Sequence, residues 1–134
     1  GFVKVLNYWL VEDCGRVINP QLVDEQQRGS VVHGLGDALY EHCIYDDAGQ
    51  LQNATMADYL VPMSFEMPDI VVEHVITPTS KTTLGAKGAG ESGMAGVPQT
   101  ILSAVNDAIR PIGGNDVTAV PITPEDVLHA LGKL

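Results

Sequence analysis

Residues 84–98, LGAKGAGESGMAGVP, form the stretch around which the rest of the chain is organised. Five of these fifteen residues are glycines, which let the backbone approach a ligand closely. One cation, Lys87, and one carboxylate, Glu91, lie among them. The spacing that follows predicts a helix at Pro98–Arg110, so the loop leads into a helix N-terminus, where an anionic group is favoured. This content is typical of a cofactor-contacting acid–base site, and also of a mobile surface loop.

Length, composition and charge argue against several classes of partner. The 134 residues are enough for one domain with a hydrophobic core, so we treat residues 1–134 as a single module. The formal charge of −10 argues against nucleic acid and against anionic membranes. No apolar run approaches the roughly 18 residues of a membrane span, and no signal-like segment opens the chain. Because the sequence starts at Gly1, without methionine, we expect it to be a piece of a larger protein.

The cysteines and histidines show no pattern typical of a metal site. Cys14 and Cys43 have no CxxC spacing, so we expect two buried, free thiols. The histidines are scattered without ligand spacing, at positions 33, 42, 74 and 129. We therefore expect no metal ligated by protein side chains.

Hydrophobic spacing predicts an alternation of strands and helices along the chain. The long helix should begin at Asn19-Pro20, because asparagine caps helices and proline suits the first helical position. The expected elements are strands at Phe2–Val11, Asp58–Val61, Ile70–Ile76 and Val117–Ile122, and helices at about Pro20–His42, at Pro98–Arg110 and from Thr123 to near Gly132. This order predicts an α+β fold in which helices pack on a small mixed sheet, in two layers.

Three glycines, Gly29, Gly34 and Gly36, interrupt the long helix, each at a cost of about 1 kcal/mol relative to alanine. Close packing of the helix on the sheet is the simpler explanation, and approach of a ligand is the alternative. The buried face of this helix should be formed by Val31, Leu35, Ala38, Leu39 and Ile44.

The glycine loop fits no standard phosphate-binding motif. Gly88–Gly93 matches GxGxxG, but a dinucleotide site needs a strand that runs straight into the first glycine, and Ile76 lies too far upstream. A P-loop would need serine or threonine after its lysine, whereas Lys87 is followed by Gly88.

Three segments carry a resemblance to a known family. They are Asp13-Cys14-Gly15 with Ile18-Asn19-Pro20, the stretch Gln26–Glu41, and Leu84–Gly93. With them, the chain resembles the C-terminal part of the large, molybdenum-cofactor-binding subunit of the molybdenum hydroxylases. This family comprises xanthine dehydrogenase, aldehyde oxidase and aerobic carbon monoxide dehydrogenase. The resemblance extends from about Val5 to Leu131.

The resemblance implies roles for particular residues. Glu91 falls on the family's active-site glutamate, the catalytic base beside the molybdenum. The loop that passes close to the pterin corresponds to four residues, Lys87, Gly88, Ala89 and Gly90. His33 falls where other members carry a glutamine that hydrogen-bonds the pterin, and is a departure from the family pattern. Glu25 is another departure, because it replaces a glycine.

The resemblance also implies an activity. The whole subunit would hydroxylate a small substrate (an aldehyde, a purine, an N-heterocycle or carbon monoxide) with oxygen derived from water. It would use a molybdopterin-type molybdenum cofactor, either the simple pterin form or the dinucleotide form. FAD and [2Fe-2S] would lie on other domains or subunits. The partners would be the rest of the large subunit and the iron–sulfur and FAD subunits, in the cytoplasm. Independently of the resemblance, we expect the isolated fragment to be inactive and to hold no molybdenum, because one loop and part of one helix cannot enclose a large cofactor. We also expect it to self-associate, because the strand Phe2–Val11 would present an unpaired edge.

Two further readings stay open at this point. A non-catalytic interaction or assembly module could keep the same fold, but it would have no need of the carboxylate of Glu91. A plain nucleotide binder could use the GxGxxG match alone.

Overall fold

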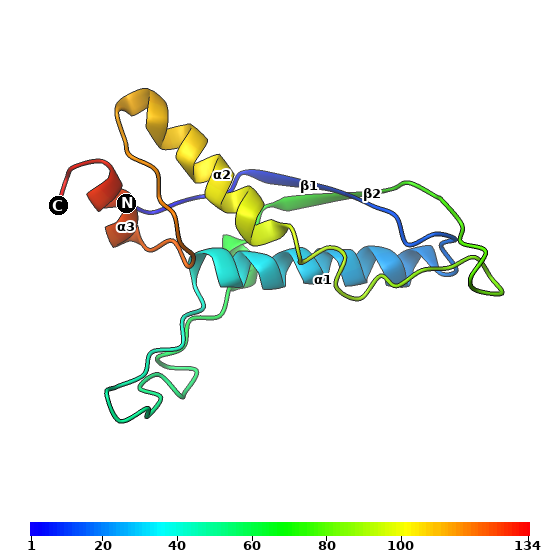
Figure 1. Cartoon of the computed structure of the whole chain (residues 1–134), viewed down its shortest axis with the longest axis horizontal. Coiled ribbons are helices and arrows are strands. Elements are labelled where there is room, and N and C mark those ends of the chain that lie inside the picture. Colours follow the sequence, from blue (N-terminus) through cyan, green and yellow to red (C-terminus); the bar gives the residue numbers. More distant parts are fainter. The chain divides into compact units, whose positions relative to one another are not determined.

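The computed structural model describes residues 1–134 and contains both helices and strands (Figure 1). The elements in chain order are β1 (Asn7–Glu12), α1 (Pro20–Leu39), a short 3-10 helix (Ser64–Glu66), β2 (Asp69–His74), α2 (Val97–Ile109), a second 3-10 helix (Arg110–Ile112) and α3 (Pro124–Ala130). This content confirms the α+β class, and its sheet consists of two parallel strands. The chain forms two compact units: a sheet unit (Val5–Gly34 and Met67–Val97) and a helical unit (Gly1–Lys4, Leu35–Glu66 and Pro98–Leu134).

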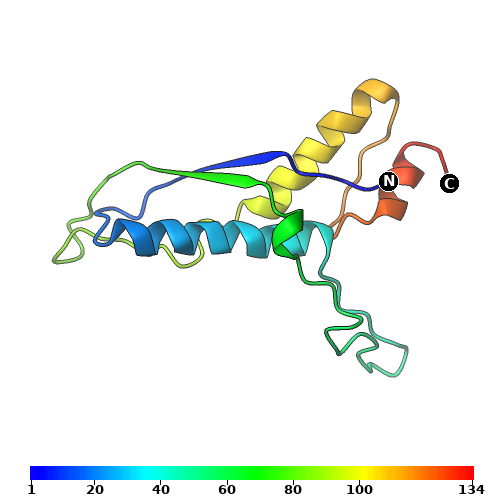
Figure 2. The ribbon, with the colours of Figure 1, turned by 180° about the vertical axis from the view of Figure 1, so that it is seen from behind.

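In the sheet unit, β1 and β2 pair in register along their whole length, beginning with Asn7 opposite Asp69. Parallel strands need a crossover connection, and α1 lies within it. Both ribbon views show the two strands running along α1 (Figures 1 and 2). The Arg28 guanidinium of α1 donates a hydrogen bond to the Ile70 carbonyl of β2. The buried side chains of this unit are Tyr8, Glu12, Cys14, Gln27, Ser30, Val31 and Val97.

β1 is shorter than the strand predicted at Phe2–Val11. It begins only at Asn7, where the first pairing partner on β2 is available. Its side chains alternate: Tyr8 and Glu12 are buried, whereas Trp9 is 68% exposed. One face of the small sheet is therefore covered and the other carries exposed apolar residues.

α1 begins as predicted and ends earlier than expected. The Asn19 side chain accepts a hydrogen bond from the Leu22 N–H at 3.2 Å, which is the predicted cap. The helix stops at Leu39 and not at His42, because the Gly36 carbonyl accepts the N–H groups of both following turn residues, Tyr40 at 2.9 Å and Glu41 at 2.8 Å. Ile44 consequently lies outside the helix and is exposed, contrary to its predicted place on the buried face.

The helical unit is built on α2, α3 and the end of α1. The observed α2 agrees with the predicted helix to within one residue. α3 begins with a capping box, in which Thr123 and Asp126 exchange backbone and side-chain hydrogen bonds. The apolar core of the helical unit comprises Leu35, Ala38, Ile101, Val105, Ile109, Ile122 and Val127.

Two predicted strands are absent. Residues Asp58–Val61 lie in and after a turn, whose Asp58 N–H donates to the Thr55 carbonyl at 3.0 Å. The stretch Val117–Ile122 is irregular because its backbone bonds go elsewhere. The Asn106 amide binds both backbone groups of Val117 at 2.8 Å, and the Ile122 N–H donates to the Ala38 carbonyl at 2.7 Å.

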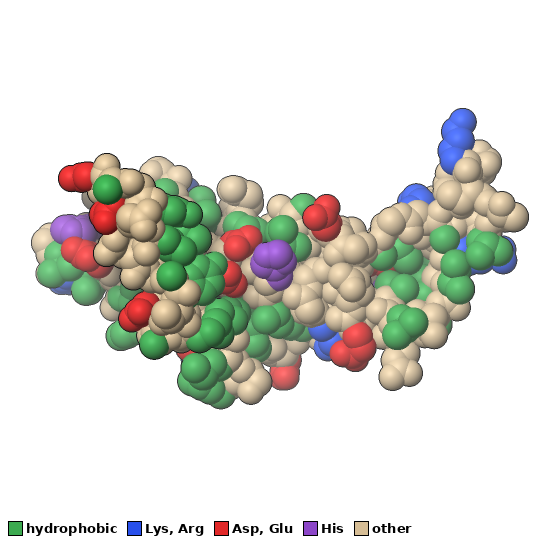
Figure 3. All heavy atoms as spheres, turned by 90° about the horizontal axis from the view of Figure 1, so that it is seen from below, with side chains coloured by type: hydrophobic (Ala, Val, Ile, Leu, Met, Phe, Trp, Pro, Cys, Tyr) green, Lys and Arg blue, Asp and Glu red, His purple; other side chains and the backbone are tan.

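The segment between α1 and the first 3-10 helix exposes many apolar side chains. Its tip is a turn at residues 46–49, closed by a hydrogen bond from the Gly49 N–H to the Asp46 carbonyl at 2.9 Å. Figure 3 shows hydrophobic side chains gathered in the left part of the view, where this segment lies. The exposed apolar residues of this segment and of the 3-10 helix that follows it are Ile44, Tyr45, Leu51, Met56, Leu60, Val61, Met63 and Phe65.

The glycines of α1 differ in their surroundings. A Cβ on Gly34 would lie 2.4 Å from the Cβ of Val97, a buried residue with no room to move. A Cβ on Gly36 would meet the Glu41 carboxylate. A Cβ on Gly29 would meet nothing within 4 Å. Close packing therefore explains Gly34 and Gly36, but the neighbours belong to α2 and to the segment after α1 and not, as predicted, to the sheet. Gly29 is left unexplained.

An ionic cluster joins β1, β2 and α1. The two ring nitrogens of His74 lie 2.6 Å from Glu12 Oε1 and 2.7 Å from Asp24 Oδ1. Asp24 and then Glu12 raise the pKa of His74 above its usual 6.5. The second oxygen of Glu12 is buried without a partner, so this carboxylate depends on His74.

The glycine contacts lead to opposite outcomes for the same substitution at two positions. Gly34→Ala should lower the free energy of unfolding by about 1–3 kcal/mol, because the methyl group overpacks against Val97. Gly29→Ala should raise it by about 0.5–1 kcal/mol through helix propensity alone. Urea unfolding of the two variants beside the parent chain measures both. A stabilising Gly34→Ala would contradict the packing account.

The ionic cluster predicts a dependence of stability on pH. A histidine whose pKa is raised on folding stabilises the chain fully below about pH 6.5, and this contribution is lost as the pH rises through the raised value. His74→Leu should cost about 3 kcal/mol at pH 6, because the buried Glu12 loses its partner, and should abolish this alkaline fall. His129→Leu, at an exposed position, is the control and should retain the fall. Thermal unfolding across pH that is identical in all three proteins would refute the assignment.

Candidate functional site

The start of the glycine loop is fastened to the segment that follows β1. The backbone N–H of Lys87 donates to the Cys14 carbonyl at 2.7 Å, and the N–H of Arg16 donates to the Gly85 carbonyl at 3.1 Å. Gly15 and Gly85 have φ angles of 70° and 74°, which favour glycine. A Cβ on Gly15 would lie 2.4 Å from the Gly85 oxygen. The Asp13-Cys14-Gly15 segment therefore serves to hold the loop.

The only cation of the loop is already paired. Lys87 Nζ lies 2.9 Å from Asp13 Oδ1, and this ammonium lowers the pKa of the Asp13 carboxyl below its usual value. Asp13 also accepts the backbone N–H of Gly15 at 2.8 Å. Lys87 thus helps to fix the loop, and its charge is largely compensated there.

The middle of the loop is held by three polar side chains of α1. Gln27 Nε2 donates to the Ala89 carbonyl at 2.9 Å, and Gln26 Nε2 donates to the Gly90 carbonyl at 2.9 Å. Ser30 Oγ donates to the same Gly90 oxygen at 3.2 Å. Two successive carbonyls of the loop therefore face α1.

The loop has a packed side and an open side. A Cβ on Gly93 would lie 2.4 Å from Gln27 Oε1 and 2.9 Å from Ser30 Cβ, so only glycine fits against α1 here. Gly88 and Gly90 differ, because a Cβ on either would meet no atom within 4 Å. The backbone at these two positions is accessible to a ligand.

Glu91 carries the one carboxylate of the loop on an exposed side chain. Its carboxylate makes no hydrogen bond or ion pair within the chain. Its backbone carbonyl accepts the N–H groups of Met94 at 3.1 Å and Ala95 at 3.3 Å, in the turns that precede α2. The backbone of Glu91 is therefore fixed while its acidic group stays free to act on a ligand.

The structure brings together most of the predicted site residues, but it does not join His33 to them. Lys87, Gly88, Ala89, Gly90 and Glu91 form one continuous stretch. His33 is exposed on α1, and no hydrogen bond or ion pair connects it with the loop. The supports Gln26, Gln27 and Ser30 were not predicted. The available signal was that Ser30 follows Gln27 by three residues and Gln26 by four, because these spacings make it a neighbour of both on the helix surface.

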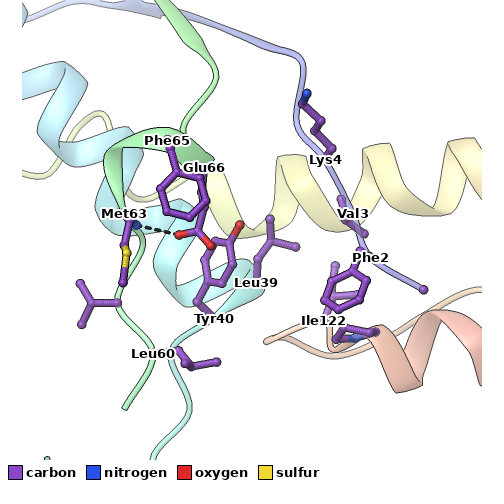
Figure 4. Close-up of a pocket in the computed structure, with 13 residues that line it drawn as sticks. Phe2, Val3, Lys4, Leu39, Tyr40, Leu60, Met63, Phe65, Glu66 and Ile122 are labelled. Carbon is purple, nitrogen blue, oxygen red and sulfur yellow. Dashed lines mark hydrogen bonds between the residues drawn. The ribbon is translucent and has the colours of Figure 1, made fainter. Parts of the chain in front are cut away.

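Other features of the chain offer no competing centre. The helical unit contains an apolar cavity of about 560 Å³. Figure 4 shows Phe2 and Val3 on one side of it and Met63 and Phe65 on the other. Its acidic residue, Glu66, is bound to the Met63 N–H at 2.7 Å. No cluster of three or more His, Cys, Asp or Glu side chains is arranged to hold a metal ion.

The two cysteines differ in their exposure. Both thiols are free, but Cys43 is exposed, so the expectation of two buried thiols is wrong for Cys43. Burial, followed by the effect of Glu12, raises the pKa of the Cys14 thiol.

None of the helices combines the length and apolar character needed to cross a membrane.

Sequence comparison identifies relatives over nearly the whole chain. This chain is 45% identical over 130 residues to the nicotine 6-hydroxylase large subunit of Paenarthrobacter nicotinovorans. The alignment covers 97% of this chain and 16% of that subunit. The chain is 34% identical over 113 residues to the carbon monoxide dehydrogenase large chain of Hydrogenophaga pseudoflava, covering 84% of this chain and 14% of the relative. The chain therefore spans only about a sixth of the length of these relatives.

Structural comparison and a family model agree with these relatives. Quinoline 2-oxidoreductase from Pseudomonas putida 86 superposes with a TM-score of 0.91 and 41% identity, over 97% of this chain and 16% of that one. Residues 1–68 match the model of the molybdopterin cofactor-binding domain, which is half of the chain. The chain belongs to the molybdopterin cofactor-binding domain family, and corresponds to a part of a molybdenum hydroxylase large subunit.

Proposed function

We propose that this chain supplies the catalytic base and part of the cofactor pocket of a molybdenum hydroxylase. The observation that carries the proposal is Glu91, a free carboxylate on a loop whose backbone is fixed by Gln26, Gln27 and Ser30. The activity is the oxidative hydroxylation of a small substrate with oxygen derived from water. It belongs to the whole subunit, and these residues span about a sixth of the length of the related nicotine 6-hydroxylase large subunit.

The loop fits a molybdopterin-type cofactor on its open side. Space lies beside Gly88 and Gly90, where a side chain would otherwise block a large ligand. The backbone N–H groups of Gly90 and Glu91 have no acceptor within the chain. Such donors suit the polar edge of a pterin or an anionic substituent. When bound, the cofactor supplies the redox chemistry and the activated oxygen.

Glu91 would act by accepting a proton at one of its carboxylate oxygens. An ionised carboxylate is acceptor-only, and no cation of the chain competes for it. Held on a fixed backbone, it can take the proton released when oxygen is added to the substrate. General-base assistance of this kind contributes roughly 10²–10⁴-fold to a rate. The free carboxylate also argues against a non-catalytic module, which would not need it.

A nitrogen heterocycle is the substrate class we favour. Two of the relatives, at 45% and 41% identity, are named for nicotine and quinoline, and both compounds contain a nitrogen heterocycle. Aldehydes, purines and carbon monoxide remain the other classes within the family. We also propose that the rest of the large subunit and iron–sulfur and FAD subunits or domains assemble with this part, in the cytoplasm.

Replacing Glu91 tests the proposed base in the complete, cofactor-loaded enzyme. Glu91→Gln keeps the size of the side chain and removes its basicity, so reduction of the molybdenum by substrate should slow by at least ~10²-fold while molybdenum content stays unchanged. The acidic limb of the rate against pH should disappear as well, because it reports ionisation of an essential base. Stopped-flow reduction and metal analysis on the same sample measure these effects.

Glu125→Gln provides the matched control, since it makes the same chemical change at an exposed position on α3. It should leave both rate and molybdenum content unaltered. A Glu91→Gln enzyme with full cofactor and near-normal reduction would exclude Glu91 as the base. Loss of molybdenum together with activity would indicate a structural role.

The exposed apolar segment described above predicts self-association of the isolated chain. We propose that other parts of the large subunit cover these side chains, of which Phe65 is 80% exposed. Exposed apolar patches of this kind promote association. Light scattering should give a mass that increases with concentration, and Met63→Ser with Phe65→Ser should shift it toward the monomer. A monomer at every concentration would count against the proposal.

A further inference from the structure

We propose that Gln27 is a positioning residue for the glycine loop, residues 84–98, an inference that rests on the proposed function. Its amide holds the loop so that the backbone N–H groups of Gly90 and Glu91 face the open side together. Gln27 touches neither substrate nor cofactor in this account. It acts through the orientation of the loop backbone.

The first support is the complete burial and complete use of the Gln27 side chain. Its exposed fraction is 0%. Nε2 donates to the Ala89 carbonyl at 2.9 Å and to Ser92 Oγ at 3.1 Å, and Oε1 lies 3.4 Å from the same hydroxyl. A buried amide without partners is costly, and all the partners of this amide belong to the loop. Gln27 is thus matched to the loop and to no other part of the chain.

The second support is the geometry of the peptide unit. A trans peptide is planar, so its N–H points away from its C=O. The Ala89 carbonyl is held toward α1 by Gln27, which directs the N–H of Gly90 to the opposite side. The Gly90 carbonyl is held by Gln26 and Ser30, which directs the N–H of Glu91 the same way. Neither N–H has an acceptor in the chain, so the pair forms a preorganised site for one acceptor group.

The third support is the fit between Gln27 and Gly93. Any side chain at Gly93 would begin 2.4 Å from Gln27 Oε1. Gln27 occupies this space beside the loop backbone, just beyond Glu91. Gln27 is therefore in contact with both Ser92 and Gly93 of the loop. Displacing the amide would leave the Ala89 carbonyl with only the Ser92 hydroxyl, which donates to it at 3.3 Å, and would loosen the direction of the adjoining N–H.

The sharpest test is Gln27→Glu in the complete, cofactor-loaded enzyme. Glutamate has the same shape, but it replaces the donor Nε2 with an oxygen that faces the Ala89 carbonyl oxygen. Gln21→Glu makes the same change at an exposed position of the same helix and serves as the control. Three properties are measured: hydrogen–deuterium exchange of peptides covering residues 84–96, the Mo(V) electron paramagnetic resonance spectrum, and kcat and KM.

For Gln27→Glu we expect loop exchange to accelerate at least ~10-fold, since local opening is governed by lost hydrogen bonds. We expect an altered Mo(V) spectrum and a fall in kcat of about 10–10²-fold with KM changed much less, as follows from misplacement of a catalytic group. Gln21→Glu should match the parent enzyme in all three. Unchanged exchange, spectrum and kcat in Gln27→Glu would overturn the inference.

The outcomes also separate this inference from the proposed function. If Glu91→Gln slows reduction while Gln27→Glu behaves like the parent, the base is correct and the positioning role is wrong. If Gln27→Glu accelerates loop exchange and alters the spectrum while Glu91→Gln is fully active, the positioning role stands and the base is wrong. Should Gln27→Glu fail to fold, Ser92→Ala removes part of the same contact from the loop side. It should produce smaller changes in the same three properties, and their absence would refute the inference.

Discussion

The hydrogen bonds from α1 to two successive loop carbonyls are the constraint on which the site depends. Gln27 binds the Ala89 oxygen, while Gln26 and Ser30 bind the Gly90 oxygen. A glycine-rich segment has high conformational entropy, and a single anchor would leave it mobile. The parallel pair β1 and β2 packs along α1 and so fixes the helix that carries these donors. The fold thereby turns a flexible sequence into a defined surface.

The paired charges at the loop stabilise its structure, whereas the unpaired carboxylate of Glu91 is available for chemistry. Lys87 is compensated by Asp13, at 2.9 Å, and Asp13 is in turn held by backbone N–H groups. Within the same unit, His74 compensates Glu12 and Asp24. Glu91, the one acidic group of the loop, has no partner in the chain. An unpaired carboxylate on a fixed backbone is what a proton acceptor requires, because a paired one would have to break an ion pair first.

Local signals in the sequence predicted much of the fold, and long-range hydrogen bonds account for the errors. Asn19 and Thr123 identified two helix starts because capping is decided within a few residues. The stretch Val117–Ile122 has strand-like composition, but the side chain of Asn106 takes its hydrogen bonds. The role of Gln27 was equally hidden, since its acceptor Ala89 lies 62 residues away. Glu91 was singled out by the residue content of the loop, and the role proposed for it came from the resemblance.

A crystal structure of the cofactor-loaded large subunit is the most direct test of the central claim, that this loop presents its backbone donors and the Glu91 carboxylate to the cofactor. We expect the N–H groups of Gly90 and Glu91 to lie within about 3.2 Å of an acceptor on the cofactor or its ligands. We also expect the Ala89 carbonyl to be still bound to Gln27 and the Glu91 carboxylate to face the molybdenum. A structure in which Glu91 is paired with a protein cation, or in which the loop faces away from the cofactor, would contradict this claim.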